Sequence, residues 1–181
     1  MMRKRQNCIG LFILLLLVTT FLIGCKEGDI SEKKAPNNFS ELIEEEYISD
    51  LSLTIYFMSP FYLTFASLDV DELISLSEKH VFITTIDGNT LGEHTDLLNQ
   101  ISNADLILAE NDSYMNARLY YVFENEKTGK MFDVAMWNSD GSILVNSVKV
   151  EYAEIFCDVV MPFLPEDSAE ELRAYLSGEW P

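Results

Sequence analysis

The side chains of this chain best suited to covalent or acid–base chemistry are three cysteines and two histidines: Cys8, Cys25, Cys157, His80 and His94. A cysteine nucleophile needs a basic partner, usually histidine, and a third group that orients the base. The sequence around Cys157 carries no local signature of such a site. We therefore expect Cys157 to be a small, half-buried hydrophobic residue at the boundary of the buried face of a helix. Cys25 differs because of the residues that precede it.

Cys25 ends a segment that has the order of an export signal. Basic residues at positions 3–5 precede an apolar run over residues 9–23, and Gly24 lies directly before the cysteine. The basic residues hold the start of the chain at the cytoplasmic face while the apolar run enters the membrane as a helix. The small Gly24 gives a peptidase access to the bond before Cys25. This order is typical of a bacterial lipoprotein signal, in which the cysteine sulfur receives a diacylglycerol and the new N-terminus a further acyl chain such as palmitate.

The pattern predicts that residues 1–24 are removed and that Cys25 becomes a lipidated N-terminus on the extracytoplasmic side of the cell membrane. The alternative is an uncleaved anchor helix. An apolar run of about 15 residues is short for that role, because a membrane span takes about 20. Two acyl chains are enough for stable anchoring, since each buried methylene contributes about 0.8 kcal/mol.

The part of the chain that follows the signal has the length of one compact domain. Removing residues 1–24 leaves 157 residues. The polar segment 25–38 is predicted to be a flexible tether, and residues 39–181 are predicted to form a single globular domain. Cys157 would then be the one cysteine of that domain, so burial of apolar surface must supply its stability without a disulfide.

The chain is strongly acidic, with 12 basic and 30 acidic residues and a formal net charge of −18. Without the signal, nine basic residues remain against thirty acidic ones, a formal charge of about −21. This charge excludes nucleic acid as a partner, because phosphate binding requires clustered lysine and arginine. A negative surface suits a cationic peptide, a metal ion or a basic protein, and it also keeps exported proteins soluble.

Alternating apolar residues and turn signals predict an α+β fold, with a single antiparallel sheet and helices packed on one face. The clearest signal is a three-stranded meander near the C-terminus, joined by turns that contain glycine. The predicted strands are residues 51–58, 81–86, 118–124, 130–137 and 142–145.

Helix starts are predicted by capping boxes, in which an N-cap side chain is followed three residues later by glutamate. The pairs are Asp69 with Glu72, Thr90 with Glu93, and Ser168 with Glu171. The first helix is expected to run to about Glu78, and Gly178 is expected to end the last one. Helical spacing of apolar residues predicts two more helices, over residues 39–48 and from Glu151 to Phe163.

Alternation in the middle strand of the meander assigns its side chains to two faces. Phe132 and Met136 belong to the face that we expect the helices to cover. Asp133 and Trp137 belong to the other face, where we expect Trp137 to share an open surface with Tyr120. Two exposed aromatic side chains would stack on a sugar or grip a peptide. The alternative is that both pack beneath a loop or helix.

Motifs of common catalytic and cofactor sites are missing from the sequence. It contains no His-x-x-x-His pair, Gly-x-Ser-x-Gly elbow or glycine-rich phosphate loop. The segment from Asp69 to Glu72 resembles the start of a calcium loop, but Leu73 and Ile74 stand where an oxygen ligand and a glycine are required. No cofactor and no metal site are therefore predicted.

The sequence favours a membrane-anchored lipoprotein whose domain is a non-enzymatic binding module for a protein, peptide or glycan of the cell envelope. Tyr120 and Trp137 are its candidate binding residues. The alternative is a small extracytoplasmic hydrolase that uses acidic residues or His94. An accessory protein that acts within a complex would differ from the first reading only in its partner.

Overall fold

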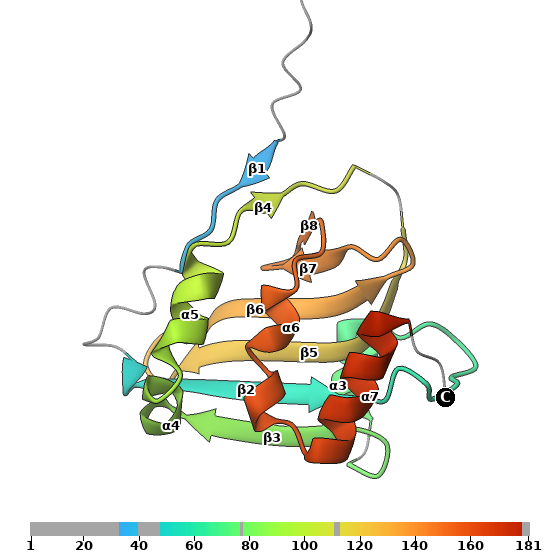
Figure 1. Ribbon diagram of the computed structural model, residues 1–181, viewed down its shortest axis with the longest axis horizontal. Helices are drawn as coiled ribbons and strands as arrows, with labels where there is room; N and C mark the ends of the chain where they lie inside the picture. The colour runs from blue at the N-terminus through green and yellow to red at the C-terminus, as the bar shows by residue number, and fades with distance from the viewer. Residues whose placement is uncertain (1–32, 40–47, 77, 111–112, 179–181) are drawn as a thin grey trace, which may run out of the picture. The chain divides into compact units, whose positions relative to one another are not determined.

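A six-stranded antiparallel sheet forms the centre of the computed structural model, which describes residues 33–39, 48–76, 78–110 and 113–178. The strand order is β3-β2-β5-β6-β7-β8 (Figure 1). The strands are β2 (Leu51–Phe57), β3 (Phe82–Asp87), β5 (Met115–Asn125), β6 (Gly129–Asn138), β7 (Ile143–Val145) and β8 (Val148–Val150). The predicted meander is confirmed as β5, β6 and β7, and the α+β class is confirmed with it.

A second, two-stranded sheet pairs β1 (Lys34–Ala35) with β4 (Leu106–Ile107). The prediction of a single sheet is therefore wrong. A bridge between Leu108 and Val150 joins the small sheet to the edge strand β8. A strand of two residues is too short for alternation to reveal it, so only its long-range partner defines it.

Residues 33–38, predicted as part of a flexible tether, are folded onto the domain. The side-chain amide of Asn37 donates to the carbonyl oxygens of Ile101 at 2.7 Å and Ala104 at 3.0 Å. Phe39 is fully buried, with its ring centroid 5.0 Å from that of Phe123 and 4.7 Å from that of Phe132. The compact unit accordingly begins at Lys33. Most of the helix predicted over residues 39–48 lies outside the described residues.

Four helices and one 3-10 turn contribute to the larger core on one face of the sheet (Figure 1). They are α4 (Gly88–Gly92), α5 (Thr95–Ser102), α6 (Ile155–Asp158), η2 (Met161–Phe163) and α7 (Glu166–Ser177). The sheet residues of this core include Phe132, Val134 and Met136, as the alternation predicts. This core is lined on the helix side by Leu91, Leu98, Ile101, Phe156 and Leu172, all fully buried or nearly so.

Two of the predicted helix starts are wrong. Helix α4 begins at Gly88, because the Asp87 carboxylate accepts from the amide of Thr90 at 2.8 Å and so caps the helix earlier than Thr90 would. Helix α7 begins after Pro165, whose carbonyl accepts from the amide of Ala169 at 2.9 Å. Its predicted end is confirmed, since Gly178 has the left-handed φ of 74°.

The helix predicted from Glu151 to Phe163 is also shorter than expected. Only Ile155–Asp158 is α-helical, and a 3-10 turn follows at Met161–Phe163. Pro162 lacks the amide proton and excludes a continuous helix through this segment.

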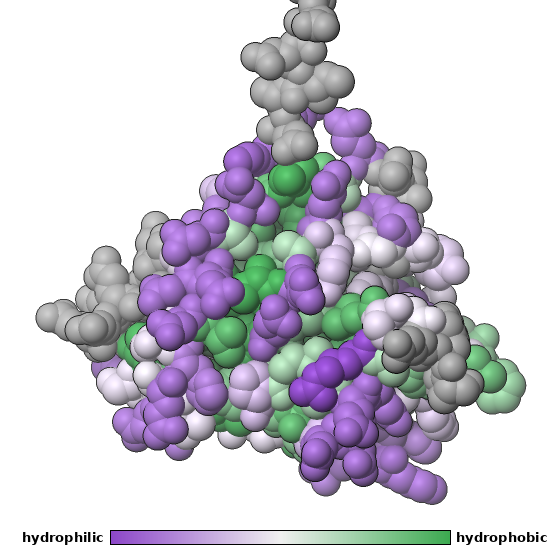
Figure 2. Space-filling model, in the orientation of Figure 1, coloured by the Kyte–Doolittle hydropathy of each residue, from purple (hydrophilic) through white to green (hydrophobic). Residues whose placement is uncertain are grey.

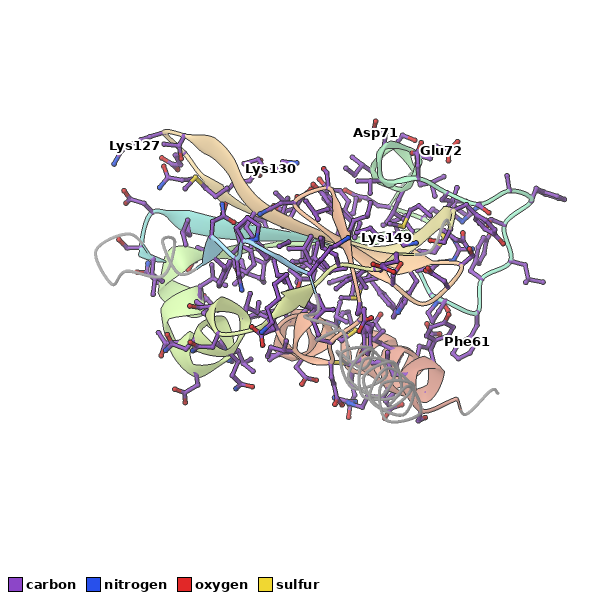
Figure 3. All side chains as sticks on the ribbon, turned by 90° about the horizontal axis from the view of Figure 1, so that it is seen from above. Phe61, Asp71, Glu72, Lys127, Lys130 and Lys149 are labelled. Carbon is purple, nitrogen blue, oxygen red and sulfur yellow. The ribbon has the colours of Figure 1, made fainter. Side chains whose placement is uncertain are left out.

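Helix α3 (Val70–Ser75) packs on the opposite face of the sheet, so the prediction of helices on one face is wrong. Figure 3 shows α3, which carries Asp71 and Glu72, on the other side of the sheet from the remaining helices. Its predicted capping box is confirmed, since Asp69 accepts from the amide of Glu72 at 2.7 Å and Glu72 accepts from the amide of Asp69 at 2.9 Å. Leu73 is the buried residue by which α3 packs on the sheet.

Candidate functional site

Tyr120 and Trp137 lie in different cores. Tyr120 is 6% exposed and packs in the smaller core beneath α3. Trp137 is 8% exposed and belongs to the larger core, with its ring centroid 4.9 Å from that of Tyr175 in α7. The expected open aromatic face is therefore not present. The pairing register of β5 and β6 shifts between Met115 and Leu119, which lie opposite the end of β6. The regular alternation of side chains between the two faces of the sheet, from which the face of Trp137 was predicted, does not hold there.

The α3 face contains a small cavity of about 220 Å³ instead. It lies among α3, the strands β5, β6 and β7, and the turn that follows β7. We call it the Asp133 pocket, and its lining residues are Val70, Asp71, Ile74, Tyr120, Lys130, Asp133, Ala135, Leu144 and Ser147.

Asp133 is the buried charged residue of this pocket, with only 8% of its surface exposed. Its Oδ2 atom accepts from the Tyr120 hydroxyl at 3.2 Å and from the Lys130 ammonium at 3.0 Å. Its Oδ1 atom is buried and has no hydrogen-bond partner among the described residues. An unsatisfied buried acceptor costs about 1–3 kcal/mol, and more when the group is charged.

A β-bulge explains how Lys130 and Asp133 come together. Residues three apart on a regular strand point to opposite faces. Here the register shifts between two successive pairs, Phe123 with Phe132 and Glu124 with Lys130, so that Met131 is an extra residue in β6. Such a bulge turns the strand and re-aims its side chains, which allows Lys130 to reach Asp133.

The turn between β7 and β8 holds the backbone of Asp133. Asn146 and Ser147 both have positive φ, 49° and 65°, and form the two-residue hairpin loop between Val145 and Val148. The amide of Asn146 donates to the Asp133 carbonyl at 2.9 Å, and the Asn146 Oδ1 atom accepts from the Asp133 amide at 3.0 Å. The backbone of Asp133 is thus held by Asn146 of the β7–β8 turn, through one main-chain and one side-chain contact.

The electrostatics of the pocket favour a cation. Burial, followed by the neighbouring Asp133 carboxylate, raises the pKa of Tyr120. The phenol therefore keeps its proton and acts as a donor at neutral pH. Two carboxylates, Asp71 and Asp133, line the pocket against one ammonium, Lys130. Figure 3 shows Lys130 and Asp71 on the same side of the sheet.

The other residues singled out in the sequence lie elsewhere. His94 precedes α5, with its ring centroid 4.9 Å from that of Phe163, and is not part of the Asp133 pocket. Cys157 is fully buried rather than half-buried, and its thiol lies 3.4 Å from the Met136 sulfur. Burial raises the pKa of the Cys157 thiol to about 12, so it is protonated at neutral pH. Cys25 lies outside the described residues.

The alternation of β6 places Asp133 on one face of the sheet but does not predict the pocket that it lines. The available signal was a single carboxylate within the apolar strand segment Met-Phe-Asp-Val-Ala-Met-Trp. A buried aspartate is rare unless it is paired. Its partners Tyr120 and Lys130, and the turn at Asn146, become apparent only when the strands are placed together.

Within the described ranges, no group of three or more His, Cys, Asp or Glu side chains is arranged to hold a metal ion. No helix in that same part of the chain has the length and hydrophobicity needed to span a bilayer. Comparisons with models of known protein families, with characterised proteins and with solved structures found no match to this chain. The geometry of the Asp133 pocket is therefore the basis for a functional proposal.

Proposed function

We propose that this chain is a bacterial membrane-anchored lipoprotein whose domain is a non-enzymatic binding module. Its binding site is the Asp133 pocket, and its ligand is a cationic side chain of a peptide or protein partner. The observation that carries this proposal is the buried Oδ1 atom of Asp133, which has no hydrogen-bond partner among the described residues. That atom is closed to solvent, so a donor brought by the ligand reaches it when the side chains around Asp133 move.

The chemistry of the pocket supports a lysine or arginine side chain as the ligand. Hydrogen bonds from a cation to a carboxylate are about twice as strong as those between neutral groups. Val70, Ile74 and Leu144 in the lining provide apolar contact for the methylene groups of such a side chain. A volume of about 220 Å³ is below the roughly 300 Å³ at which small-molecule pockets begin, so it suits one side chain better than a whole ligand.

The charge of the protein supports the same class of partner. Without the signal, a formal net charge of about −21 attracts basic peptides and repels acidic ones over distances of about a Debye length, roughly 10 Å in ordinary buffer. Lys130 competes with the ligand, because its ammonium already occupies Oδ2 of Asp133 at 3.0 Å. The ligand must therefore share the carboxylate with Lys130 or displace it.

The test is the binding of a short arginine-containing peptide amide to the full lipidated chain in detergent, measured by calorimetry. We expect Asp133→Asn to weaken binding at least tenfold, which corresponds to about 1.4 kcal/mol. Lys130→Met should strengthen binding several-fold, because it removes the competing ammonium. The matched control is Asp105→Asn, which removes the same charge at the exposed pair with Lys34. If Asp133→Asn and Asp105→Asn weaken binding equally, the peptide is attracted by the negative surface in general. The proposal that the Asp133 pocket is the binding site is then wrong.

The lipid anchor has a separate test. Cells grown with an alkyne-tagged fatty acid should incorporate the tag into the wild-type protein and leave the Cys25→Ser variant unlabelled. The variant should also be released from the membrane fraction or retain its signal segment. A Cys25→Ser protein of wild-type size that is still membrane-bound would support the uncleaved anchor helix instead.

A further inference from the structure

The loop that joins β2 to α3 exposes large apolar side chains. Tyr62, Leu63 and Phe65 are 47%, 93% and 114% exposed. Figure 2 shows a hydrophobic projection at the right edge of the molecule, where Figure 1 draws the chain between β2 and α3. We call residues 59–68 the apolar loop. Contiguous exposed apolar side chains of this kind mark interaction sites.

The apolar loop carries no charge although the protein is highly charged. Charged residues make up 23% of the chain, yet none occurs between Asp50 and Asp69. The loop can therefore move from water into an apolar environment without the free-energy cost of desolvating a charged group.

Contacts with the domain hold the apolar loop in place. The guanidinium of Arg118, only 7% exposed, donates to the Thr64 hydroxyl at 3.0 Å. That hydroxyl donates in turn to the carbonyl of Ala66 at 2.7 Å. The ring of Phe61 packs against that of Tyr175, with centroids 6.2 Å apart. Phe61 and Thr64 thus face the domain, and Leu63 and Phe65 are presented outward. Tyr62 is half-exposed and keeps a contact with His80, whose ring centroid lies 5.7 Å from its own.

We propose that Tyr62, Leu63 and Phe65 insert into the interfacial region of the bilayer to which Cys25 anchors the domain. This inference rests on the lipid anchor of the proposed function. Eight residue steps separate Cys25 from Lys33, where the compact unit begins, and they span at most about 29 Å. A domain on so short a chain remains close to the lipid surface.

The shape of the apolar loop favours lipid over a protein partner. Leu63 and Phe65 protrude almost completely, so a protein partner would need a shaped pocket for each of them. A fluid interface accepts protruding apolar side chains without such pockets, and the amphipathic ring of Tyr62 suits the headgroup boundary. Asp69, Asp71 and Glu72 follow the loop directly, so insertion should be stronger into zwitterionic than into anionic lipid.

The test is the depth of a nitroxide label attached to Leu63→Cys in the lipidated protein, reconstituted into phosphatidylcholine vesicles. The buried, protonated thiol of Cys157 does not compete for the label. Lys127→Cys, in the β5–β6 turn, is the matched control, and Phe65→Cys gives a second, independent site. We expect labels at 63 and 65 to be accessible to oxygen and protected at least fivefold from a water-soluble nickel chelate relative to the label at 127.

Three other results would overturn the insertion. Labels at 63 and 127 that are equally accessible to the chelate place the apolar loop in water. Protection that disappears when the protein is diluted with excess lipid, together with spin–spin coupling that is lost when labelled protein is mixed with unlabelled protein, assigns the loop to contact between copies of this chain. Protein that fails to float with the vesicles shows that the anchor itself is wrong, whereas floating protein with the loop in water leaves the anchor intact.

Discussion

The phenol hydroxyl of Tyr120 lies 3.2 Å from the Oδ2 atom of Asp133 on the neighbouring strand. The two residues are not direct cross-strand partners, since Tyr120 pairs with Ala135 and Asp133 pairs with Val122. Their contact is therefore diagonal, and it links β5 to β6 beneath α3. This pair connects the stability of the smaller core to the chemistry of the Asp133 pocket.

Tyr120→Phe should lower the free energy of unfolding by about 1–2 kcal/mol, because a hydrogen bond to a charged acceptor is lost while the ring remains in place. Urea denaturation of the full chain measures the change. Tyr114→Phe is the control, since Tyr114 is 64% exposed, and it should change stability by less than about 0.5 kcal/mol. Equal effects of the two substitutions would mean that the contact with Asp133 adds nothing to stability.

Trp137→Ala should destabilise the fold by about 3–5 kcal/mol, because it empties part of the larger core next to Tyr175. The comparison is Phe65→Ala in the apolar loop, which should leave the urea midpoint nearly unchanged. A loss below about 1 kcal/mol for Trp137→Ala would show that this side chain is not a core residue.

Gly88→Ala should destabilise the protein by about 3 kcal/mol, since a Cβ atom there would overlap the Ile48 carbonyl oxygen and lie 2.7 Å from that of Ser49. Gly92 lies in the same helix, and the nearest atom to its Cβ position is Ile48 Cγ2 at 4.0 Å. Gly92→Ala should be neutral or stabilise by up to about 1 kcal/mol, as alanine restricts the unfolded chain. Thermal melting of both variants tests the difference, and equal melting points would contradict the close approach.

Stability should fall in alkaline solution through Cys157. Burial raises the pKa of its thiol to about 12, whereas an unfolded cysteine titrates near 8.5. Above about pH 9 the unfolded chain loses this proton and the folded chain keeps it, so rising pH favours unfolding until about pH 12.

Urea titrations between pH 8 and 11 measure this effect against Cys157→Ala, which lacks the thiol. The stability advantage of the wild type over the variant should shrink by about 1 kcal/mol per pH unit above pH 9. A difference that stays constant with pH would show that the thiol titrates alike in both states.

The local features of this fold could be predicted from sequence because their causes are local. The period-2 alternation of β2 and of the β5–β7 meander, the Asp69–Glu72 capping box and the stop at Gly178 each depend on a few neighbouring residues. The capping pattern predicts the wrong start where two residues compete to cap the same helix, as Asp87 and Thr90 do. Lipidation of Cys25 stays a prediction of the sequence.

The α+β class, the meander, the strong negative charge and the expectation of a lipid-anchored chain follow from composition and local pattern. The pairing of β1 with β4, the place of Trp137 in the larger core and the contact of Lys130 with Asp133 across a bulge emerge when the chain is folded. These contacts join residues that no local pattern relates. A one-residue change of register moves a side chain to the other face of a sheet, and such changes are set by the partner strand rather than by the strand's own sequence.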